Sequence, residues 1–397
     1  MKKIKQALCT RRTALFGMAG AIAEIAGCGG GGTSVAGLSS GGTGSFTSGT
    51  ITGFGSIIVN GIRYNNESAT VLTSDDSVSS NPALQLGMVV NIEGSAVKPA
   101  SSTTGLPTAT AYRITYGSEW IGPVSNRATT TFEILGHTVD VLATTLFGGV
   151  VQQLSELTDT HFVEVYGYVD QVDGHIQASR IDVSTVQPSA YKLSGAITQI
   201  NQVSGTANLG QTAISWSVPA VLPSGLSSGD FVRVVLDPSP VGAVWTATRI
   251  QQVSSPLSRL SADHDYEAEI HGSITAYQSS ANFVVNGIPV NASAAQITGT
   301  LAVGVQVEVE GSIRSGQLVA TKVATKTASQ VETQEFEFYG VISNVTAQTF
   351  VVRGETFYYD ANTANSSLLT RNPLPYVEVK ARRTNGRWQA IEIDLED

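Results

Sequence analysis

The residues best suited to chemistry lie in one short run, Asp263-His264-Asp265-Tyr266-Glu267-Ala268-Glu269-Ile270-His271. Every second side chain of an extended strand points to the same face, so Asp265, Glu267, Glu269 and His271 are expected to project together. Alternating carboxylates with one imidazole could hold a divalent cation. The alternative is the solvated face of an exposed strand, whose charges discourage edge pairing. No other part of the chain repeats this run of acids.

Other motifs of catalysis and metal binding are missing from the sequence. It has no Gly-x-Ser-x-Gly elbow, no Walker loop, no His-Glu-x-x-His and no pair of cysteines spaced for a metal. The five histidines are scattered: His137, His161, His175, His264 and His271. We therefore expect a protein that is not an enzyme and has no cofactor. A metal-dependent protein or enzyme that uses residues 263–271 is the alternative.

Flat aromatic rings could also stack on sugars, which makes the tryptophans candidates for glycan contact. Strand parity places Trp120 in a core beside Val124, whereas Trp245 and Trp388 open strands and could be half exposed. Packing in a core or at a barrel end is the favoured interpretation of all three. Binding of an envelope glycan, as in an adhesin, is kept as an alternative.

An internal repeat supplies the elements that must position these residues. A glycine, one further residue and then Ile or Val open each of five copies: Gly49–Ile51, Gly122–Val124, Gly195–Ile197, Gly272–Ile274 and Gly340–Ile342. A short apolar strand that ends near glycine follows in four copies: Ile57–Gly61, Phe132–Gly136, Phe283–Gly287 and Phe350–Gly354. The third copy is degenerate there, with Ala207-Asn208-Leu209-Gly210.

Later in each copy every second residue is apolar, as in Val305, Val307 and Val309, which is typical of a half-buried strand. Parity places the opening glycine on the apolar face, where a side chain would block tight curvature. Each copy offers about five strands, with a short helix expected at Val150–Leu157 in the second. The predicted fold is all-β, a tandem array of five small five-stranded barrels of the OB type. Their ranges are 46–117, 118–187, 188–256, 257–328 and 329–397.

The N-terminus has the pattern of an export signal over residues 1–27. Its positive region contains Arg11 and Arg12, and the apolar stretch Ala14–Ala26 is too short to span a bilayer. Residues 28–45 form a tether, because eight of the 17 residues from Gly29 to Ser45 are glycine. Without residues 1–27 the chain has 18 basic and 31 acidic residues, a net charge of −13. That sign argues against nucleic acid as a partner.

The sequence Ile25-Ala26-Gly27-Cys28 resembles the lipobox of bacterial lipoproteins. The resemblance implies cleavage before Cys28 and lipidation of this cysteine. Since Gly29 follows, it also implies sorting to the outer membrane. Ordinary signal cleavage after Ala23 is the alternative, which would leave Cys28 as a free thiol in a soluble periplasmic or secreted protein. Thr10–Phe16, with Arg11 and Arg12, resembles a twin-arginine export motif, and a plain basic region remains open.

The five ordered copies resemble an uncharacterised bacterial family, a domain of unknown function that recurs in tandem in envelope lipoproteins. They are also similar to small OB-fold proteins of the periplasm. This resemblance covers about residues 46–395 and implies a fold and a location, but no activity. We expect a lipid-anchored, non-enzymatic envelope protein with a binding, structural or display role. Its partners would be the membrane, through the lipid only, and an envelope protein or glycan.

Overall fold

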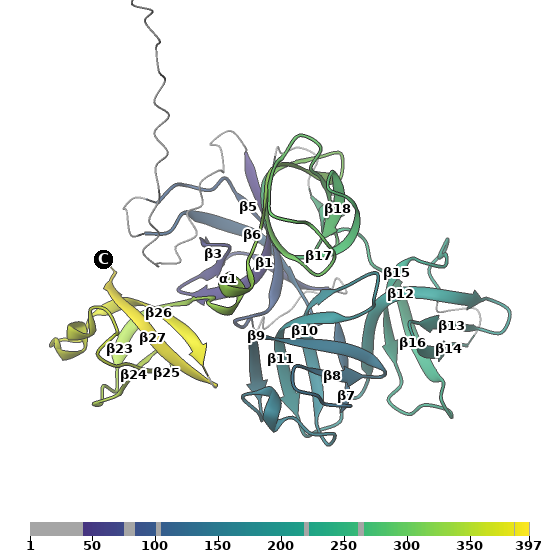
Figure 1. Ribbon diagram of the computed structural model, residues 1–397, viewed down its shortest axis with the longest axis horizontal. Helices are drawn as coiled ribbons and strands as arrows, with labels where there is room; N and C mark the ends of the chain where they lie inside the picture. The colour runs from purple at the N-terminus through teal and green to yellow at the C-terminus, as the bar shows by residue number, and fades with distance from the viewer. Residues whose placement is uncertain are drawn as a thin grey trace, which may run out of the picture. The chain divides into compact units, whose positions relative to one another are not determined.

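The computed structural model describes residues 43–74, 84–100, 105–217, 222–260, 266–384 and 386–396. Arg11, Arg12 and Cys28 lie outside these ranges, as do Asp263, His264 and Asp265. Strands account for most of the described residues (Figure 1). The N-terminal strand β1 begins at Gly44, so the last two residues of the predicted tether are part of a strand.

The strands form five successive groups, here named barrels 1 to 5. Barrel 1 contains β1 (Gly44–Phe54), β2 (Ile57–Val59), β3 (Ile62–Asn65), β4 (Thr70–Thr73), β5 (Val89–Ser95) and β6 (Thr108–Tyr116). Barrel 2 contains β7 (Trp120–Ser125), β8 (Thr131–Ile134), β9 (His137–Gly149), β10 (Phe162–Val169) and β11 (Ile176–Ser184). Barrel 3 contains β12 (Tyr191–Asn201), β13 (Thr206–Leu209), β14 (Thr212–Ser215), β15 (Phe231–Leu236) and β16 (Trp245–Gln252).

The last two groups follow the same plan. Barrel 4 contains β17 (Tyr266–Ser279), β18 (Asn282–Val285), β19 (Ile288–Asn291), β20 (Gln296–Thr298), β21 (Gln306–Arg314) and β22 (Gln317–Thr325). Barrel 5 contains β23 (Phe336–Ser343), β24 (Thr349–Val352), β25 (Glu355–Tyr358), β26 (Tyr376–Thr384) and β27 (Arg387–Leu395). The short strands β4 and β20 pair with the last strands of their own barrels.

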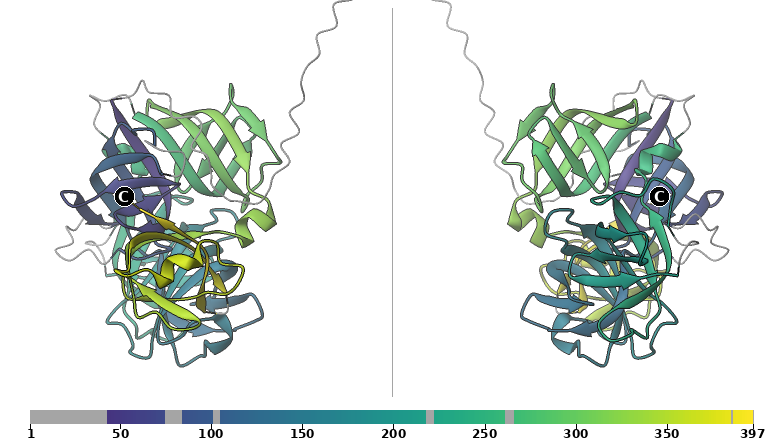
Figure 2. Two further views of the ribbon diagram at one scale, coloured as in Figure 1. Left: turned by 90° about the vertical axis from the view of Figure 1, so that its left-hand side faces the viewer. Right: turned by 90° about the vertical axis from the view of Figure 1, so that its right-hand side faces the viewer.

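All five barrels close by one circuit of strand pairs. In barrel 2, β7 pairs with β8, β8 with β9, β9 with β11, β11 with β10, and β10 again with β7. Only the pairing of third with fifth strand is parallel. The same circuit closes the other four barrels, including the degenerate third copy. The prediction of an all-β array of small five-stranded barrels is therefore confirmed, and Figure 2 shows the crossing strands of barrel 4 in green.

The opening glycine makes room for the turn between the second and third strands. In barrel 1 this turn is Asn60-Gly61, with φ of 54° and 73°. In barrel 4 it is Asn286-Gly287, with φ of 53° and 76°. Two successive residues with positive φ form the tight hairpin turn that Asn-Gly favours. A Cβ on Gly49 or Gly272 would collide with the amide oxygen of Asn60 or Asn286. In barrels 1 and 4 the glycine thus serves close packing against a turn.

The hydrophobic cores join some barrels to one another. The cores of barrels 2 and 3 form one cluster of buried side chains, and those of barrels 1 and 5 form another. Barrel 4 has its own core, to which Phe46 of β1 contributes. Strand pairs also cross between barrels: β1 pairs in parallel with β17 and with β23, and β7 meets β12 at Ile121 and Lys192.

Helical structure in the described residues is short. The α-helix α1 (Ala328–Glu332) lies between barrels 4 and 5, and 3₁₀ turns lie at η1 (Leu154–Glu156), η2 (Pro256–Arg259) and η3 (Ser366–Thr370). The helix expected at Val150–Leu157 is thus reduced to the single turn η1. Among the described residues, no helix is long and apolar enough to cross a membrane.

Candidate functional site

Two of the four predicted candidate residues come together on β17. Glu269 and His271 lie two residues apart on this strand, as the alternation predicted, and a third ligand, Glu308, is directly opposite His271 on β21. One ligand atom of each residue lies within 4.8 Å of the others. Glu267 occupies β17 as well but does not belong to this group, and Asp265 lies outside the described residues.

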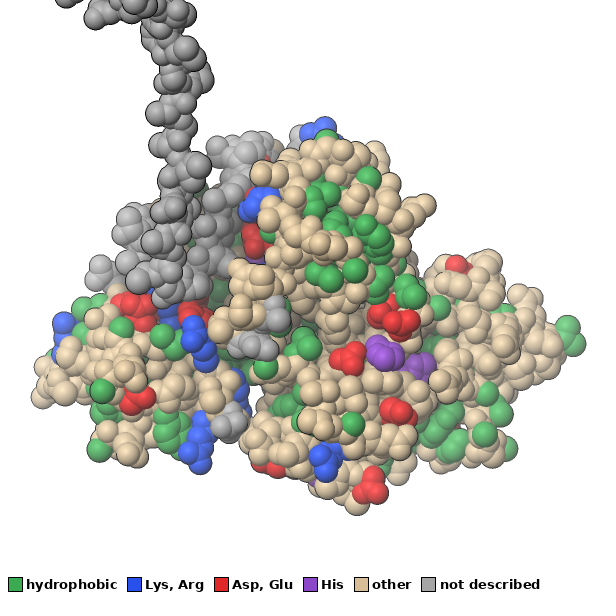
Figure 3. Space-filling model, viewed as in Figure 1, with side chains coloured by type: hydrophobic (Ala, Val, Ile, Leu, Met, Phe, Trp, Pro, Cys, Tyr) green, Lys and Arg blue, Asp and Glu red, His purple; other side chains and the backbone are tan. Residues whose placement is uncertain are grey.

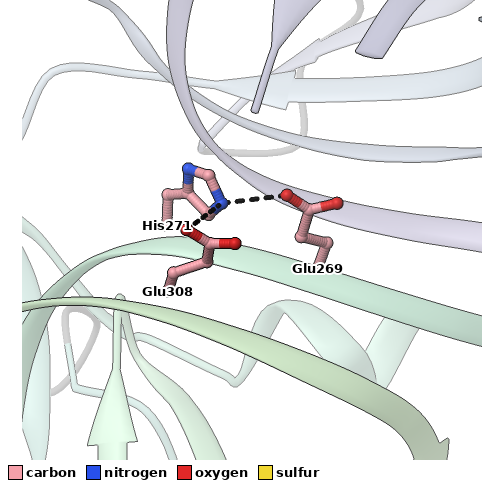
Figure 4. Close-up of side chains that lie close together, drawn as sticks. All are labelled: Glu269, His271 and Glu308. Carbon is pink, nitrogen blue, oxygen red and sulfur yellow. Dashed lines mark ion pairs between the residues drawn. The ribbon is translucent and has the colours of Figure 1, made fainter. Parts of the chain in front are cut away.

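The three side chains point toward one another (Figure 4). His271 Nε2 is 2.9 Å from Glu269 Oε1 and 3.8 Å from Glu308 Oε2. The exposed fractions of the side chains are 3% for Glu269, 12% for His271 and 19% for Glu308. The predicted alternative, a solvated face of an exposed strand, is therefore wrong for Glu269 and His271. The physical reason is that β17 is covered on both sides: β1 pairs with it as far as Ile270, with Thr47 opposite Glu269, and β21 pairs with it at His271.

Two lysines border the group. Lys326 Nζ lies 3.4 Å from His271 Nδ1, and Lys322 Nζ lies 2.6 Å from Glu310, the residue opposite Glu269 on β21. Burial lowers the pKa of His271 to about 3, helped by the charge of Lys326. Burial and the nearby Glu310 raise the pKa of Glu269 to about 8. At neutral pH the imidazole is therefore uncharged, and its contact with Glu269 is not an ion pair.

Side-chain amides fix the backbone of this site. Asn286 donates a hydrogen bond from Nδ2 to the carbonyl oxygen of His271, 2.9 Å away. Asn60 donates from Nδ2 to the carbonyl oxygen of Glu269, 3.3 Å away. Both asparagines belong to the hairpin turns that pack against the opening glycines. The repeat architecture thus positions the two ligands on β17.

A comparison of strand registers shows that barrel 5 has carboxylates at the positions of both Glu269 and Glu308. Counting back from the opening glycine, Glu337 occupies the position of Glu269, and Tyr339 occupies that of His271. Tyr339 is opposite Glu378 on β26, just as His271 is opposite Glu308. The acidic run as a whole is not repeated, but these positions are. Alignment of the copies on their opening glycines would have revealed the equivalence of Glu337 and Tyr339 to Glu269 and His271. Glu308, in contrast, can be recognised only from the pairing of β17 with β21.

Barrel 2 has a glutamate at the same position with a different partner. Glu119 lies three residues before Gly122, and Arg233 of barrel 3 approaches it with a nitrogen–oxygen distance of 3.1 Å. Burial is the largest influence on the pKa of Glu119 and acts to raise it, but the charges of Arg233 and Lys192, together with hydrogen bonds from Ser194 and Arg233, outweigh burial and hold this pKa below its usual value. One repeat position therefore carries a charged carboxylate in barrel 2 and a carboxyl with a raised pKa in barrels 4 and 5.

Trp120 and Trp388 are buried and present no ring face on which a sugar could stack. Trp120 is fully buried, as predicted, and donates from Nε1 to the carbonyl oxygen of Ser194. Trp388 is only 4% exposed and packs edge-on against Phe336 and Phe338, which agrees with the favoured interpretation of packing in a core or at a barrel end. The side chains around it fill the end of barrel 5. Trp245 is partly buried against Tyr191.

A cavity of about 260 Å³ lies at a junction of barrels 1 to 4. Its lining includes Tyr168 and Phe231 beside two ion pairs, Arg113–Glu93 and Arg233–Glu119. Each of these pairs joins a positive to a negative side chain, and the lining also contains Arg259. Figure 3 shows that much of one molecular face is backbone and neutral polar side chains, in accordance with the 14% content of charged residues.

A comparison with protein families identifies the repeated unit. The sequence profile of "Domain of unknown function (DUF5666)" matches residues 47–98, 121–182, 271–324 and 339–394. These four segments fall in barrels 1, 2, 4 and 5 and together cover more than half of the chain. Barrel 3, which has the same strand circuit, is outside the matched segments. No curated protein matches the chain.

Proposed function

Because this chain belongs to the DUF5666 family, whose description assigns no activity, we propose its function from its own residues: it is a lipid-anchored, non-enzymatic scaffold of the bacterial cell envelope. The observation that carries the proposal is the tandem array itself. Five barrels close by one circuit, and strands of different barrels pair directly, as β1 does with β17 and β23. An array of this kind suits the display of binding surfaces, since loops vary while cores persist.

We also propose that each barrel is of the OB type. Support comes from the five strands, the parallel pair of third and fifth strands, and closure of the fourth strand on the first. OB barrels bind oligosaccharides and oligonucleotides through their strands and loops. The net charge of −13 for residues 28–397 disfavours an oligonucleotide here, so an envelope glycan or protein is the partner class we favour.

Anchoring is proposed to occur through Cys28, which lies outside the described residues and follows an export signal. Lipidation of one cysteine and its amine would place a glycine-rich tether between the membrane and barrel 1. The outer membrane is the proposed location because Gly29 follows Cys28.

The anchor is tested by replacing Cys28 with Ala and fractionating bacterial cells. The wild-type chain is expected in the membrane fraction, and the Cys28→Ala chain in the soluble fraction. Mass spectrometry of the N-terminal peptide should find acyl chains on the wild type alone. Identical fractionation of the two chains would contradict lipid anchoring.

The binding role is tested by thermal unfolding of the Cys28→Ala chain with peptidoglycan fragments and envelope glycans. A ligand that binds only the folded state raises the melting temperature by mass action. A concentration-dependent rise with one glycan class would identify the partner class. Turnover of any such ligand during the assay would contradict the non-enzymatic proposal.

A further inference from the structure

We propose that barrel 4 contains a binding site for one divalent transition-metal ion, for which Zn²⁺ is the best match, ligated by Glu269, His271 and Glu308. This inference goes beyond the proposed scaffold function and does not depend on the lipid anchor. It rests on the convergence of three donor atoms, on two buried atoms without hydrogen-bond partners, and on the comparison with barrel 5.

The spacing of the donor atoms suits a small ion. Zinc bonds to histidine nitrogen and carboxylate oxygen are about 2.0–2.2 Å long, which separates the ligands of a tetrahedral site by about 3.3 Å. The distances from His271 Nε2 to the nearest oxygens of Glu269 and Glu308, 2.9 Å and 3.8 Å, lie on either side of this value. Small side-chain rotations would bring both oxygens to a shared ion.

Two atoms of the group have no hydrogen-bond partner although they are buried. They are His271 Nε2, which makes no hydrogen bond although Glu269 Oε1 lies 2.9 Å away, and Glu269 Oε2, whose side chain is 3% exposed. Buried polar atoms are nearly always paired, so such atoms call for an explanation. An ion between the carboxylates and the imidazole would supply the missing interaction for both residues.

The chemistry of the donors selects the metal. An imidazole nitrogen with two carboxylates suits Zn²⁺ and its neighbours in the first transition row, whereas Mg²⁺ and Ca²⁺ prefer oxygen alone. Lys326 contacts His271 at Nδ1, across the ring from Nε2, so its ammonium does not occupy the position of the ion. Lys322 is held by Glu310. A water molecule would complete a site of three protein ligands.

Barrel 5 provides an internal comparison. It has carboxylates at both equivalent positions, Glu337 and Glu378, but Tyr339 replaces the histidine. A neutral phenol is a poor ligand at neutral pH, and burial raises the pKa of Tyr339 far above its usual value. The two barrels therefore differ at the one residue that provides the nitrogen ligand.

The experiment uses the full-length chain with Cys9 and Cys28, its two cysteines, replaced by serine so that no thiol binds zinc. The metal-free protein is titrated with Zn²⁺ in a calorimeter, alone and with excess Mg²⁺ or Ca²⁺. We expect one ion per chain, undisturbed by either competitor. Two variants remove a ligand, His271→Tyr and Glu308→Gln. Glu378→Gln in barrel 5 is the matched control.

His271→Tyr and Glu308→Gln should weaken binding more than the roughly 10–100-fold typical of losing an outer-shell partner, and Glu378→Gln should leave it unchanged. Glu308 is 19% exposed, so the Glu308→Gln variant is expected to fold even if the tyrosine disturbs barrel 4. Absence of zinc binding by the parent chain, or equal affinity in the parent, His271→Tyr and Glu308→Gln, would overturn the site.

Discussion

Asn286 Nδ2 lies 2.9 Å from the carbonyl oxygen of His271 and donates a hydrogen bond to it, which ties a hairpin turn of barrel 4 to the strand that carries the candidate ligands. The amide oxygen of the same asparagine occupies the space that a Cβ on Gly272 would need. Asn60 and Gly49 have the same relationship in barrel 1. In barrels 1 and 4 the opening glycine and the turn that follows are therefore parts of one packing unit.

We expect Gly272→Ala to destabilise barrel 4, because the added methyl group collides with Asn286. Overpacking of this kind costs about 1–3 kcal/mol. Adding Asn286→Gly should recover part of the loss, since glycine tolerates the positive φ of 53° and removes the colliding atom. Hydrogen exchange of the β17 amides measures the effect in barrel 4 separately from the other barrels.

The matched control for this prediction is Gly195→Ala in barrel 3. A Cβ there would meet only the Leu209 side chain, at a comfortable 4.0 Å. Its effect on stability should remain within about 0.5 kcal/mol. Equal destabilisation by Gly272→Ala and Gly195→Ala would show that strand curvature, and not contact with the asparagine, requires the glycine.

Local alternation in the sequence was sufficient to predict the strands and their inward faces. Val305, Val307 and Val309 alternate with polar residues, and the copies repeat this signal in the same order. It also placed Trp120 in the core. These features depend on neighbouring residues of one strand, which is why a single sequence reveals them.

Contacts between distant segments were not predictable in this way. The pairing of β1 with β17 buries Glu269, and nothing in residues 263–271 indicates that a strand more than 200 residues earlier covers them. Glu308 joins the site through the register of β17 with β21, which alternation does not determine. Packing of Trp388 in a core or at a barrel end was the favoured interpretation, but its position at the start of a strand does not reveal which aromatic rings surround it.

We expect Arg233→Met to destabilise barrels 2 and 3 together, because it leaves the Glu119 carboxylate without its counter-charge. Breaking a buried ion pair costs about 3–5 kcal/mol, and the lower end applies because Glu119 is 22% exposed. Tryptophan fluorescence during urea unfolding measures the change. Trp120, Trp216 and Trp245 all belong to or pack against the shared core of these two barrels.

Replacing Glu119 with Gln in the Arg233→Met chain should restore much of the lost stability, since the unpaired carboxylate charge is then removed. Arg113→Met serves as the comparison, because Arg113 is 38% exposed in its pair with Glu93. A pair of that exposure contributes about 1 kcal/mol or less. If Arg233→Met were no more costly than Arg113→Met, the Glu119–Arg233 pair would not hold barrels 2 and 3 together.

The stability of barrel 5 should fall as the pH rises through 7. Burial, with the charge of Glu378 nearby, raises the pKa of Glu337 from 4.5 to about 7. The folded state therefore holds a proton that the unfolded state has lost between these two pH values. The stabilising contribution is complete below pH 4.5 and is lost as the pH rises through 7. Above pH 7 the buried charge destabilises barrel 5 by about 3 kcal/mol.

Glu337→Gln should accordingly raise the melting temperature of barrel 5 at pH 8 and have little effect at pH 4.5. Glu119→Gln, at the equivalent position of barrel 2, should have the opposite sign. Because Arg233, Lys192 and Ser194 together hold the pKa of Glu119 below its usual value against the effect of burial, the charged form stabilises the fold at pH 8, and this contribution is lost as the pH falls through the folded-state pKa. Calorimetric melts at both pH values compare the two variants. If Glu337→Gln and Glu119→Gln changed the melting temperature in the same direction at pH 8, the two glutamates would not differ in their partners as we infer.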